Sequence, residues 1–523
     1  GAQAPACPGV GSNRGSTASS CRTLADVAWY FYSTDLRTVA FGNNTNPANL
    51  DVATNNVLTT ADDKNQAQHM NFFAMGLGIE GKLAFSADYQ TAVTGDFADV
   101  LAGTKNWPAV ANLDPTGVDD LWHATVNGHG KYFSARNVPN VVAGLREALN
   151  KIGARVGSAA AAATSNLEPV AGDNFAYVAS YATVDWTGDL QSRSIDVNTG
   201  DVSADTACTT VGSGCQWSAQ GKLDNLTWSV RRLFIKPTSG TSGDALRRFT
   251  FTDLTVAERA LFNPSTLSQY TALVGSNPAD ITASNLVDFL RGNRGLEQDG
   301  NVSHAQIWRR RTHVFGDIVN TQPVYMKAPN GAYTDPGYAT FVSSGTAASR
   351  RPVVFVSSQD GYLHAINAHT ASQTVSASSV APGEEMWAFM PTAVMPSVKT
   401  LADVNYAHRY FVDGQISIAD VDFGGGDWHT ILVGGQGAGG NSYYALDVTD
   451  PTTPKYLWEF TDANLGNTFS NATVSKLPNG EWAVLFSSGY NNTVSGGDGI
   501  GRVYALNPQT GAIKSGFPMS TGS

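Results

Sequence analysis

The chain has 523 residues, more than one hydrophobic core normally holds, so at least two domains are expected. Charged residues make up 15% of the chain, whereas 53 glycines and 10% aromatic residues indicate β-structure with tight turns and argue against disorder. The net charge is −11 and no basic cluster exceeds Arg309–Arg311, so nucleic acid is not an expected partner. That short run is interpreted as a salt-bridging or solvated edge. No apolar run reaches the roughly 18 residues of a transmembrane helix, so no membrane span is expected.

The four cysteines form two close pairs in the sequence, Cys7 with Cys21 and Cys208 with Cys215. Each pair brackets Gly/Ser/Thr-rich sequence without a nearby histidine to complete a zinc set. Two loop-closing structural disulfides in an oxidising compartment are the economical interpretation, and four free thiols in a cytosolic protein are the alternative. The Gly/Ser/Pro-rich start of the chain, residues 1–21, indicates that it begins after processing or after a truncation.

The first part of the chain, residues 22–155, has a mixed α/β pattern. Thr23 is a predicted N-cap for a helix with apolar residues at positions 24, 27, 28 and 31. The later pattern predicts a buried strand within 70–79, a helix over 119–127, a strand over 131–134 and a helix over 138–152.

An Ala/Gly/Ser-rich stretch, residues 153–172, marks the expected boundary between a domain over 1–155 and a domain over 156–523. Beyond it the pattern changes to strands, beginning with residues 175–181. A helical insertion is expected near 255–293, and the clearest later strands are predicted at 352–356, 429–433 and 482–486.

One short phrase recurs in this second part, in residues 360–368, 440–448 and 502–507. Each copy places alternating apolar residues before Ala-Leu/Ile-Asn/Asp, and tryptophans follow the first two copies at positions 387 and 458. A weaker copy precedes Trp217. Repetition at this interval predicts a radial β-architecture, in which the tryptophans pack between neighbouring units rather than against a cofactor.

Several blocks of this part, in order, resemble the type IV pilus biogenesis and tip-adhesin family (the PilC/PilY group). The resemblance covers about residues 300–523 and rests on the stretches 316–325, 358–365, 412–414, 429–451 and 488–492. Residues 22–155 resemble the C-terminal half of a von Willebrand factor A-like domain, chiefly in 120–124 and 130–135.

The resemblance implies a mainly β fold: a modified quinoprotein-like β-propeller over 156–523, preceded by a partial α/β von Willebrand factor A-like segment over 1–155. It implies a secreted, non-enzymatic pilus assembly factor and tip-associated adhesin at the pilus tip or outer-membrane surface of a Gram-negative bacterium. Such a protein promotes pilus extension, surface attachment and twitching motility. Its expected partners are minor pilins, the pilus tip complex and a host or abiotic surface.

Metal sites of both families are not found as motifs in this sequence. The Asp-x-Ser-x-Ser loop of A-type domains does not occur, and neither does a full copy of the Asp-rich calcium loop that is expected for the pilus family. Asp420, Asp422 and Asp427 are candidate calcium ligands around a glycine turn, but Gly424 and Ile431 occupy positions where further ligands are needed. A Gly-rich hairpin whose aspartates cap backbone amides is the favoured interpretation. No cofactor is predicted for this segment.

Other catalytic patterns are weak. Gly435, Gly437 and Gly440 form a dinucleotide-like string, but a strand pattern follows where a helix is required. The adjacent Glu384 and Glu385 are interpreted as a solvated pair, and no Gly-x-Ser-x-Gly elbow accompanies the nine histidines. We therefore expect no catalytic residues.

A quinone-cofactor (PQQ-type) dehydrogenase is the alternative function, because that class shares the repeated propeller phrase. It characteristically carries two adjacent cysteines, which this chain lacks. A pure scaffold for outer-membrane assembly is a third possibility that the sequence does not separate from adhesion.

Overall fold

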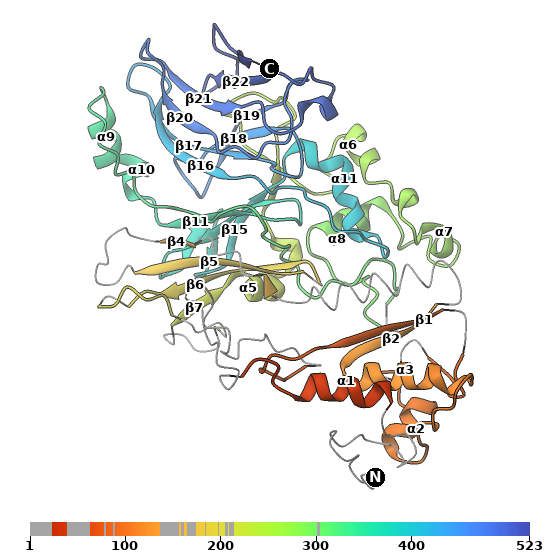
Figure 1. Ribbon diagram of the computed structural model, residues 1–523. Coiled ribbons are helices and arrows are strands. Elements are labelled where there is room, and N and C mark those ends of the chain that lie inside the picture. The colour runs from red at the N-terminus through yellow and green to blue at the C-terminus, as the bar shows by residue number, and fades with distance from the viewer. Residues whose placement is uncertain are drawn as a thin grey trace. The chain divides into compact units, whose positions relative to one another are not determined.

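The structure is a computed structural model, shown in Figure 1. It describes residues 23–38, 63–77, 80–86, 89–90, 92–135, 156–157, 162–164, 174–183, 185–196, 198–203, 208, 214–300 and 304–522. The chain divides into two compact units, residues 1–155 and 156–523. No helix within the described residues is long and apolar enough to cross a membrane.

In the first unit, the described strands form a parallel pair, β1 (Phe72–Leu77) and β2 (His129–Ala135). The helices described in this unit are α1 (Leu24–Ser33), α2 (Asp96–Ala102) and α3 (Thr116–Asn127). The helices and strands expected in 24–31, 70–79, 119–127 and 131–134 are therefore confirmed, although residues 72–75 of β1 are partly and not fully buried. The helix expected over 138–152 lies outside the described residues, as do Cys7 and Cys21.

Hydrogen bonds at the start of α1 connect this helix to α3. Asp26 accepts a hydrogen bond from the Thr23 amide at 3.2 Å, and Asp120 of α3 accepts one from the Leu24 amide at 2.9 Å. A carboxylate at this position satisfies free amides and favours the positive end of the helix. Aromatic side chains around the buried Trp122 fill the space next to α3 and β2: Tyr89, Phe97, Trp107 and Tyr132.

In the second unit, the described strands form four main sheets. The first contains β3 (Val156–Gly157), β4 (Ala162–Thr164), β5 (Phe175–Ala182), β6 (Thr187–Ser194) and β7 (Cys215–Ser218). The second contains β10 (Val324–Met326), β11 (Val353–Ser357), β12 (Leu363–Asn367), β15 (Glu385–Phe389), β8 (Leu233–Ile235) and β9 (Arg247–Arg248).

The third and fourth sheets are regular antiparallel meanders. The third contains β16 (Ile416–Asp422), β17 (Trp428–Gly435), β18 (Tyr443–Asp447) and β19 (Lys455–Phe460). The fourth contains β20 (Thr473–Lys476), β21 (Trp482–Ser487), β22 (Gly501–Leu506) and β23 (Met519–Gly522). A separate hairpin pairs β13 (Gln373–Val375) with β14 (Ser378–Val380).

The sheets follow one another radially. Strands β4, β10, β16 and β20 each contact the corresponding strand of the neighbouring sheet, and Figure 1 shows the sheets succeeding each other in chain order. The mainly β architecture expected for 156–523 is therefore confirmed, with strands at the predicted positions in β5, β11, β17 and β21.

The predicted helical insertion is also confirmed. It contains α6 (Val256–Leu261), η4 (Pro264–Thr266), α7 (Tyr270–Leu273) and α8 (Ala283–Leu290). Strands β8 and β9 lead into it; β8 pairs in parallel with β15, and β9 is the edge strand on this side of the second sheet. Short elements elsewhere in the unit are α5 (Ala219–Asn225), η3 (Trp228–Val230), α9 (Tyr338–Ser343), α10 (Gly345–Ser349), η5 (Thr392–Val394), α11 (Met395–Val398), η6 (Lys399–Ala402) and η7 (Asn492–Ser495).

The tryptophans after the repeated phrase join neighbouring sheets. Trp387 of the second sheet donates from Nε1 to the Pro451 carbonyl before the last strand of the third sheet, at 2.7 Å. Trp458 of the third sheet donates to the Pro508 carbonyl before the last strand of the fourth, at 2.8 Å. The predicted role of these tryptophans in packing between neighbouring sheets is thus confirmed.

Glycine is required at two of the junctions between sheets, that of the first with the second and that of the third with the fourth. Gly383 in the second sheet has φ +78°, and a Cβ there would lie 2.6 Å from the Trp217 ring of the first sheet. Gly511 in the fourth sheet has φ +70°, and a Cβ there would lie 2.6 Å from the Trp458 ring. Both the conformation and the space demand glycine at these two positions, which follow the first and third copies of the repeated phrase.

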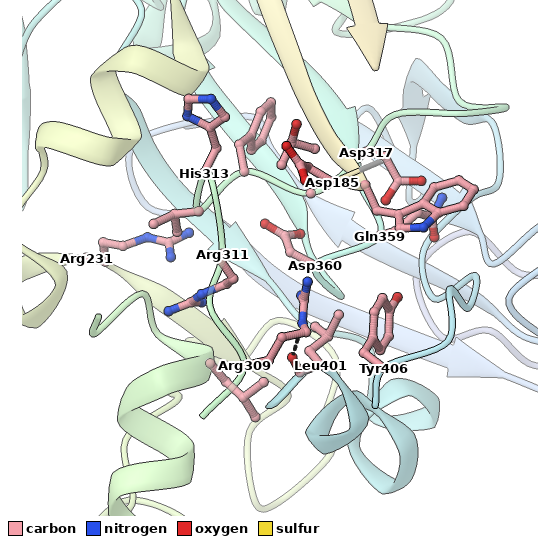
Figure 2. A pocket seen from close by; sticks show the side chains of 16 residues that line it. Asp185, Arg231, Arg309, Arg311, His313, Asp317, Gln359, Asp360, Leu401 and Tyr406 are labelled. Atoms are coloured by element: carbon pink, nitrogen blue, oxygen red, sulfur yellow. Dashed lines mark hydrogen bonds between the residues drawn. The ribbon is translucent and has the colours of Figure 1, made fainter. Parts of the chain in front are cut away.

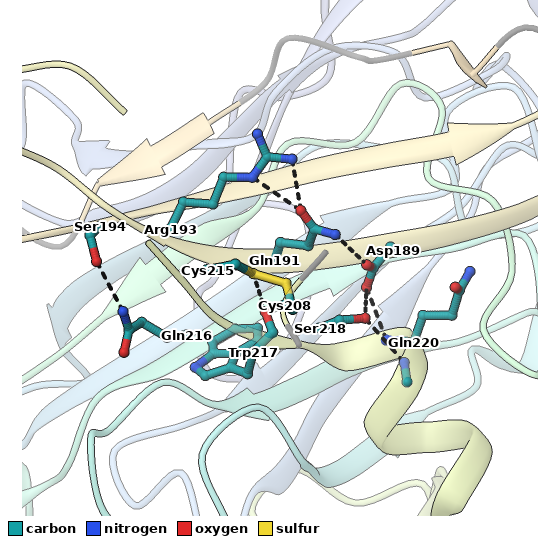
Figure 3. The surroundings of a disulfide bond; sticks show 11 residues. Asp189, Gln191, Arg193, Ser194, Cys208, Cys215, Gln216, Trp217, Ser218 and Gln220 are labelled. Atoms are coloured by element: carbon teal, nitrogen blue, oxygen red, sulfur yellow. Dashed lines mark hydrogen bonds between the residues drawn. A yellow bond between two sulfur atoms is a disulfide. The ribbon is translucent and has the colours of Figure 1, made fainter. Parts of the chain in front are cut away.

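The predicted Cys208–Cys215 disulfide is present, with the two Cα atoms 4.7 Å apart, and it anchors the start of β7 in the first sheet (Figure 3). Beside it, the Asp189 carboxylate accepts hydrogen bonds from the Ser218 hydroxyl at 2.9 Å and from the Gln220 amide at 3.0 Å. The edge strand β7 is therefore held by a covalent bond at one end and by a polar cap at the other.

Candidate functional site

The second unit contains a pocket between the first and second sheets, shown in Figure 2. Its lining comes from the β5–β6 turn (185–187), from Arg309, Arg311 and residues 313–317, from the β11–β12 turn (359–360), and from Arg231, Leu290, Leu401 and Tyr406. The space within it that water can enter is about 30 Å³. Of its lining residues, Asp185 is exposed and Trp186 and Tyr406 are partly exposed, so the lining reaches the surface at these residues.

Next to this interior lies a buried cluster of charged side chains. Arg231, from the segment before β8, makes two hydrogen bonds of 2.8 Å to Glu385 at the start of β15. Glu385 is also 2.8 Å from Nδ1 of His364, in β12. Nε2 of His364 is 3.1 Å from Oδ1 of Asp360, in the β11–β12 turn. The two carboxylates and two cations thus alternate along one line.

The charges of the cluster stabilise one another. Burial lowers the pKa of His364, but the two carboxylates outweigh burial and raise that pKa to about 9. Burial raises the pKa of Glu385, yet Arg231 and His364 bring it down to about 2. The His364 imidazolium likewise holds the pKa of Asp360 below its ordinary value against the effect of burial. At neutral pH all four side chains are charged.

Three members of this region are spaced like a Ser–His–acid triad, since Ser358 Oγ is 3.0 Å from Nε2 of His364. However, the Ser358 hydroxyl donates to Asp360, and both nitrogens of His364 face carboxylates. An imidazolium does not accept the serine proton, and the Ser358 side chain is fully buried. This geometry favours a structural role for the three residues.

Asp360 and Arg309, two charged residues of the pocket lining, each have side-chain atoms that form no hydrogen bond with the described residues. Oδ2 of Asp360 is buried and has no hydrogen-bond partner. Arg309 stacks on Tyr406, 4.5 Å from the ring centre, and its Nε donates to the Leu401 carbonyl at 2.8 Å, whereas its Nη atoms bond no other described residue. In Figure 2 the Arg309 guanidinium points toward the Asp360 carboxylate.

The entrance of the pocket is lined partly by aromatic surface. Trp186, in the β5–β6 turn, has φ +51°, a conformation that bulky residues rarely adopt. It stacks on His408 with 3.7 Å between the ring centres, and Tyr410 meets His408 edge-on at 5.0 Å. His408 in turn is 2.7 Å from the Asp317 carboxylate, which fixes the stack to the pocket wall.

Comparisons with known proteins identify the family. Residues 315–519 match the family model of the PilY1 β-propeller domain. A type IV pilus biogenesis factor PilY1 from Pseudomonas aeruginosa (strain UCBPP-PA14) is 34% identical over 502 residues, which are 90% of this chain and 39% of that protein. The chain belongs to the PilY1 family.

Further relatives extend the PilY1 comparison. The PilY1 of P. aeruginosa strain PAO1 is 33% identical over 90% of this chain and 39% of its own length, and a PilY1 homolog of Xylella fastidiosa is 33% identical over 79% and 32%. This chain therefore spans about two fifths of the length of its P. aeruginosa relatives. A crystal structure of the P. aeruginosa PilY1 C-terminal domain is 33% identical and covers 36% of this chain and 35% of its own, but its TM-score of 0.26 supports no comparison of folds.

The three candidate calcium ligands of this PilY1-family chain each have protein partners. Asp420 accepts from Tyr338 at 2.7 Å and from Thr430 at 2.6 Å. Asp422 caps the amides of the turn after β16, at 2.8 Å for Gly424. The Asp427 side chain, 67% exposed, is 3.3 Å from Nε2 of His429. Only Asp422 caps backbone amides as the favoured hairpin interpretation predicts, whereas Asp420 and Asp427 contact side chains. The described residues contain no group of three or more His, Cys, Asp or Glu side chains that could hold a metal ion.

The interpretation of Glu384 and Glu385 as a solvated pair is wrong for Glu385. The two side chains do point different ways, since Glu384 caps the Ala381 amide at 2.8 Å. Glu385 instead points inward and is buried, because Arg231 supplies the counter-charge. Arg231 lies 154 positions away in the sequence. A partner at that separation leaves no local signal.

The charged pocket was not predicted, although one signal for it exists. His364 precedes Ala365 in the first copy of the repeated phrase, where the other copies have Tyr444 and Tyr504. A histidine at a buried position that elsewhere carries tyrosine indicates a local counter-charge. The string Gly435, Gly437, Gly440 is followed by strand β18, as predicted, so it forms a turn.

Proposed function

We propose that this chain is the propeller-bearing part of a type IV pilus biogenesis factor and acts in pilus assembly. The observation that carries the proposal is the similarity of 90% of the chain to proteins named type IV pilus biogenesis factor PilY1. In this role the propeller is a rigid scaffold whose loops bind other proteins of the pilus. Minor pilins and the pilus tip complex are the proposed partners.

The proposal includes a surface-exposed, adhesive role. The protein would be secreted, lie at the pilus tip or outer-membrane surface, and support surface attachment and twitching motility. The Cys208–Cys215 disulfide supports an oxidising compartment. A host or abiotic surface would then be a second partner.

We further propose that the function is non-enzymatic. The fully paired His364, which cannot act as a general base at neutral pH, supports this proposal, and so does the absence of adjacent cysteines from the sequence. For residues 1–155 we propose a partial von Willebrand factor A-like segment, supported by the parallel β1–β2 pair with α3 before β2. Calcium is proposed to bind the natural protein outside the Asp420–Asp427 hairpin.

Two experiments test this function. Pull-down of the purified chain with minor and major pilin ectodomains, followed by calorimetry with and without calcium, is expected to give saturable binding to at least one minor pilin. In the source bacterium, deletion of the gene is expected to reduce surface pili and twitching zones, with recovery on complementation. Normal piliation after deletion, together with no pilin binding, would contradict the proposal.

A further inference from the structure

We propose that the pocket between the first and second sheets binds a saccharide, through Arg309 and Asp360 in its interior and Trp186 at its entrance. The proposal does not rest on the role in pilus assembly. It rests on three observations of the pocket: two complementary charged groups that each keep atoms without a hydrogen-bond partner, a balance of charge in the lining, and partly exposed aromatic side chains.

The first observation concerns hydrogen bonding. Arg309 and Asp360 point toward each other but do not form an ion pair, and a buried carboxylate oxygen without a donor is costly. A hydroxyl group both donates and accepts, so one placed between them satisfies Oδ2 of Asp360 and an Nη atom of Arg309 together. The narrow interior, about 30 Å³, has room for a group of that size.

The second observation concerns charge. The carboxylates of Asp360 and Asp317 face His364 and His408, and Arg231 and Arg311 face Glu385 and Glu297. Among the described lining residues, this leaves one carboxylate, that of Asp185, and one guanidinium, that of Arg309, which have opposite charges. A neutral ligand rich in hydroxyl groups matches this balance and still uses charge-assisted hydrogen bonds.

The third observation concerns the entrance. Trp186 and Tyr406 both line the pocket and are partly exposed, and both are held in place: Trp186 by the ring of His408, and Tyr406 by the guanidinium of Arg309. Fixed aromatic surface next to polar groups suits a ring that has apolar C–H faces and polar edges. The strained backbone of Trp186 is of the kind that concentrates at ligand-binding sites.

The test is ligand-observed NMR and calorimetry of the purified chain with methyl glycosides of glucose, galactose, mannose and N-acetylglucosamine, with acetamide and glycine as non-saccharide probes. We expect at least one glycoside to bind saturably, and we expect neither acetamide nor glycine to bind. Arg309→Met should weaken that binding about tenfold or more, as loss of a hydrogen bond to a charged group predicts.

The matched control is Arg310→Met, because Arg310 is the exposed neighbour that does not line the pocket. Trp186→Asn removes the indole while keeping a residue that tolerates positive φ, and it should also weaken binding. The unfolding temperature of each variant is measured as well, and a variant is used only if this temperature equals that of the parent. Weaker binding then reports loss of the site and not loss of the fold. Failure of every glycoside to bind, equal binding by Arg309→Met and the parent, or binding of acetamide or glycine alone would each overturn the proposal.

Discussion

The second and third sheets carry the same repeated phrase on the same strand framework, but their interiors differ in charge. Ala365 faces Trp387 across β12 and β15, just as Ala445 faces Trp458 across β18 and β19. Immediately beside these pairs, the second sheet has His364 and Glu385, where the third has Tyr444 and Tyr456 at the corresponding register positions.

The difference between the two sheets depends on what covers them. The second sheet is extended by β8, and Arg231 just before β8 brings the counter-charge that the buried Glu385 requires. The third sheet ends at β19 and has tyrosines at these positions. The comparison teaches that the repeated phrase tolerates ionic residues in its interior where a neighbouring segment neutralises them.

The largest expected effect comes from breaking the ionic cluster of the second sheet. Glu385→Gln should lower the free energy of unfolding by about 3–5 kcal/mol, because it leaves Arg231 as a buried charge without a counter-ion. Urea denaturation of the purified protein measures this. The double substitution Arg231→Met with Glu385→Met should recover much of the loss, whereas Tyr456→Phe in the third sheet should cost less than about 1.5 kcal/mol. An equal loss in the two sheets would contradict the comparison.

The second prediction concerns pH. The folded pKa of His364, about 9, lies above its unfolded value, so its contribution to stability is complete below about pH 6.5 and is lost as the pH rises through 9. The loss is at most about 3 kcal/mol at 1.36 kcal/mol per pKa unit.

Thermal unfolding between pH 6 and pH 10 checks this loss. The His364→Gln variant should be less stable at pH 6 and should lack the decline between pH 7 and pH 10 that the parent shows. A parallel decline in both proteins would assign it to other groups.

The third prediction concerns the glycine at the junction of the third and fourth sheets. Gly511→Ala should cost about 2–3 kcal/mol, because it combines an unfavourable φ with a clash against the Trp458 ring. Gly516→Ala is the matched control, because Gly516 also has a positive φ, +84°, but no atom lies near the position of an added Cβ. This variant should lose only about 1 kcal/mol, from the strained backbone conformation. Equal unfolding energies for the two variants would show that the ring contact contributes nothing.

The smallest expected effect is at the aspartates of the third sheet. Asp422→Ala should cost about 1 kcal/mol, since it removes the cap from the amides of Gly424 and Gly426. Millimolar calcium should leave the melting temperatures of the parent and of the variant unchanged. A calcium-dependent rise that disappears in Asp422→Ala would establish the metal site in place of the hairpin cap.

Much of the fold could be predicted because its determinants are local and repeated. The phrase around Ala365 and Ala445 fixes both a strand and the tryptophan that follows it, and the cap at Thr23 fixes the start of α1. Such signals lie within a few residues of each other, where side-chain periodicity reveals them.

The pocket could not be predicted, because its parts are distant in the sequence. Trp186, Arg309 and Asp360 come from three separate segments, and none of them stands in a pattern that indicates its neighbours. Glu385 was misinterpreted for the same reason. Adjacent acidic residues in a strand do point in opposite directions, but which of them is buried depends on Arg231, a residue outside the strand pattern.

The junctions between sheets have a consequence for how the sequence can change over time. The tryptophans donate to main-chain carbonyls, at Pro451 and Pro508, rather than to side chains. Any residue supplies a carbonyl, and proline additionally restrains the backbone that presents it. Apart from Gly511, the loops around these acceptors are therefore free to exchange their side chains while the order and spacing of the sheets persist, so that surface variation and architectural constancy are compatible in one chain.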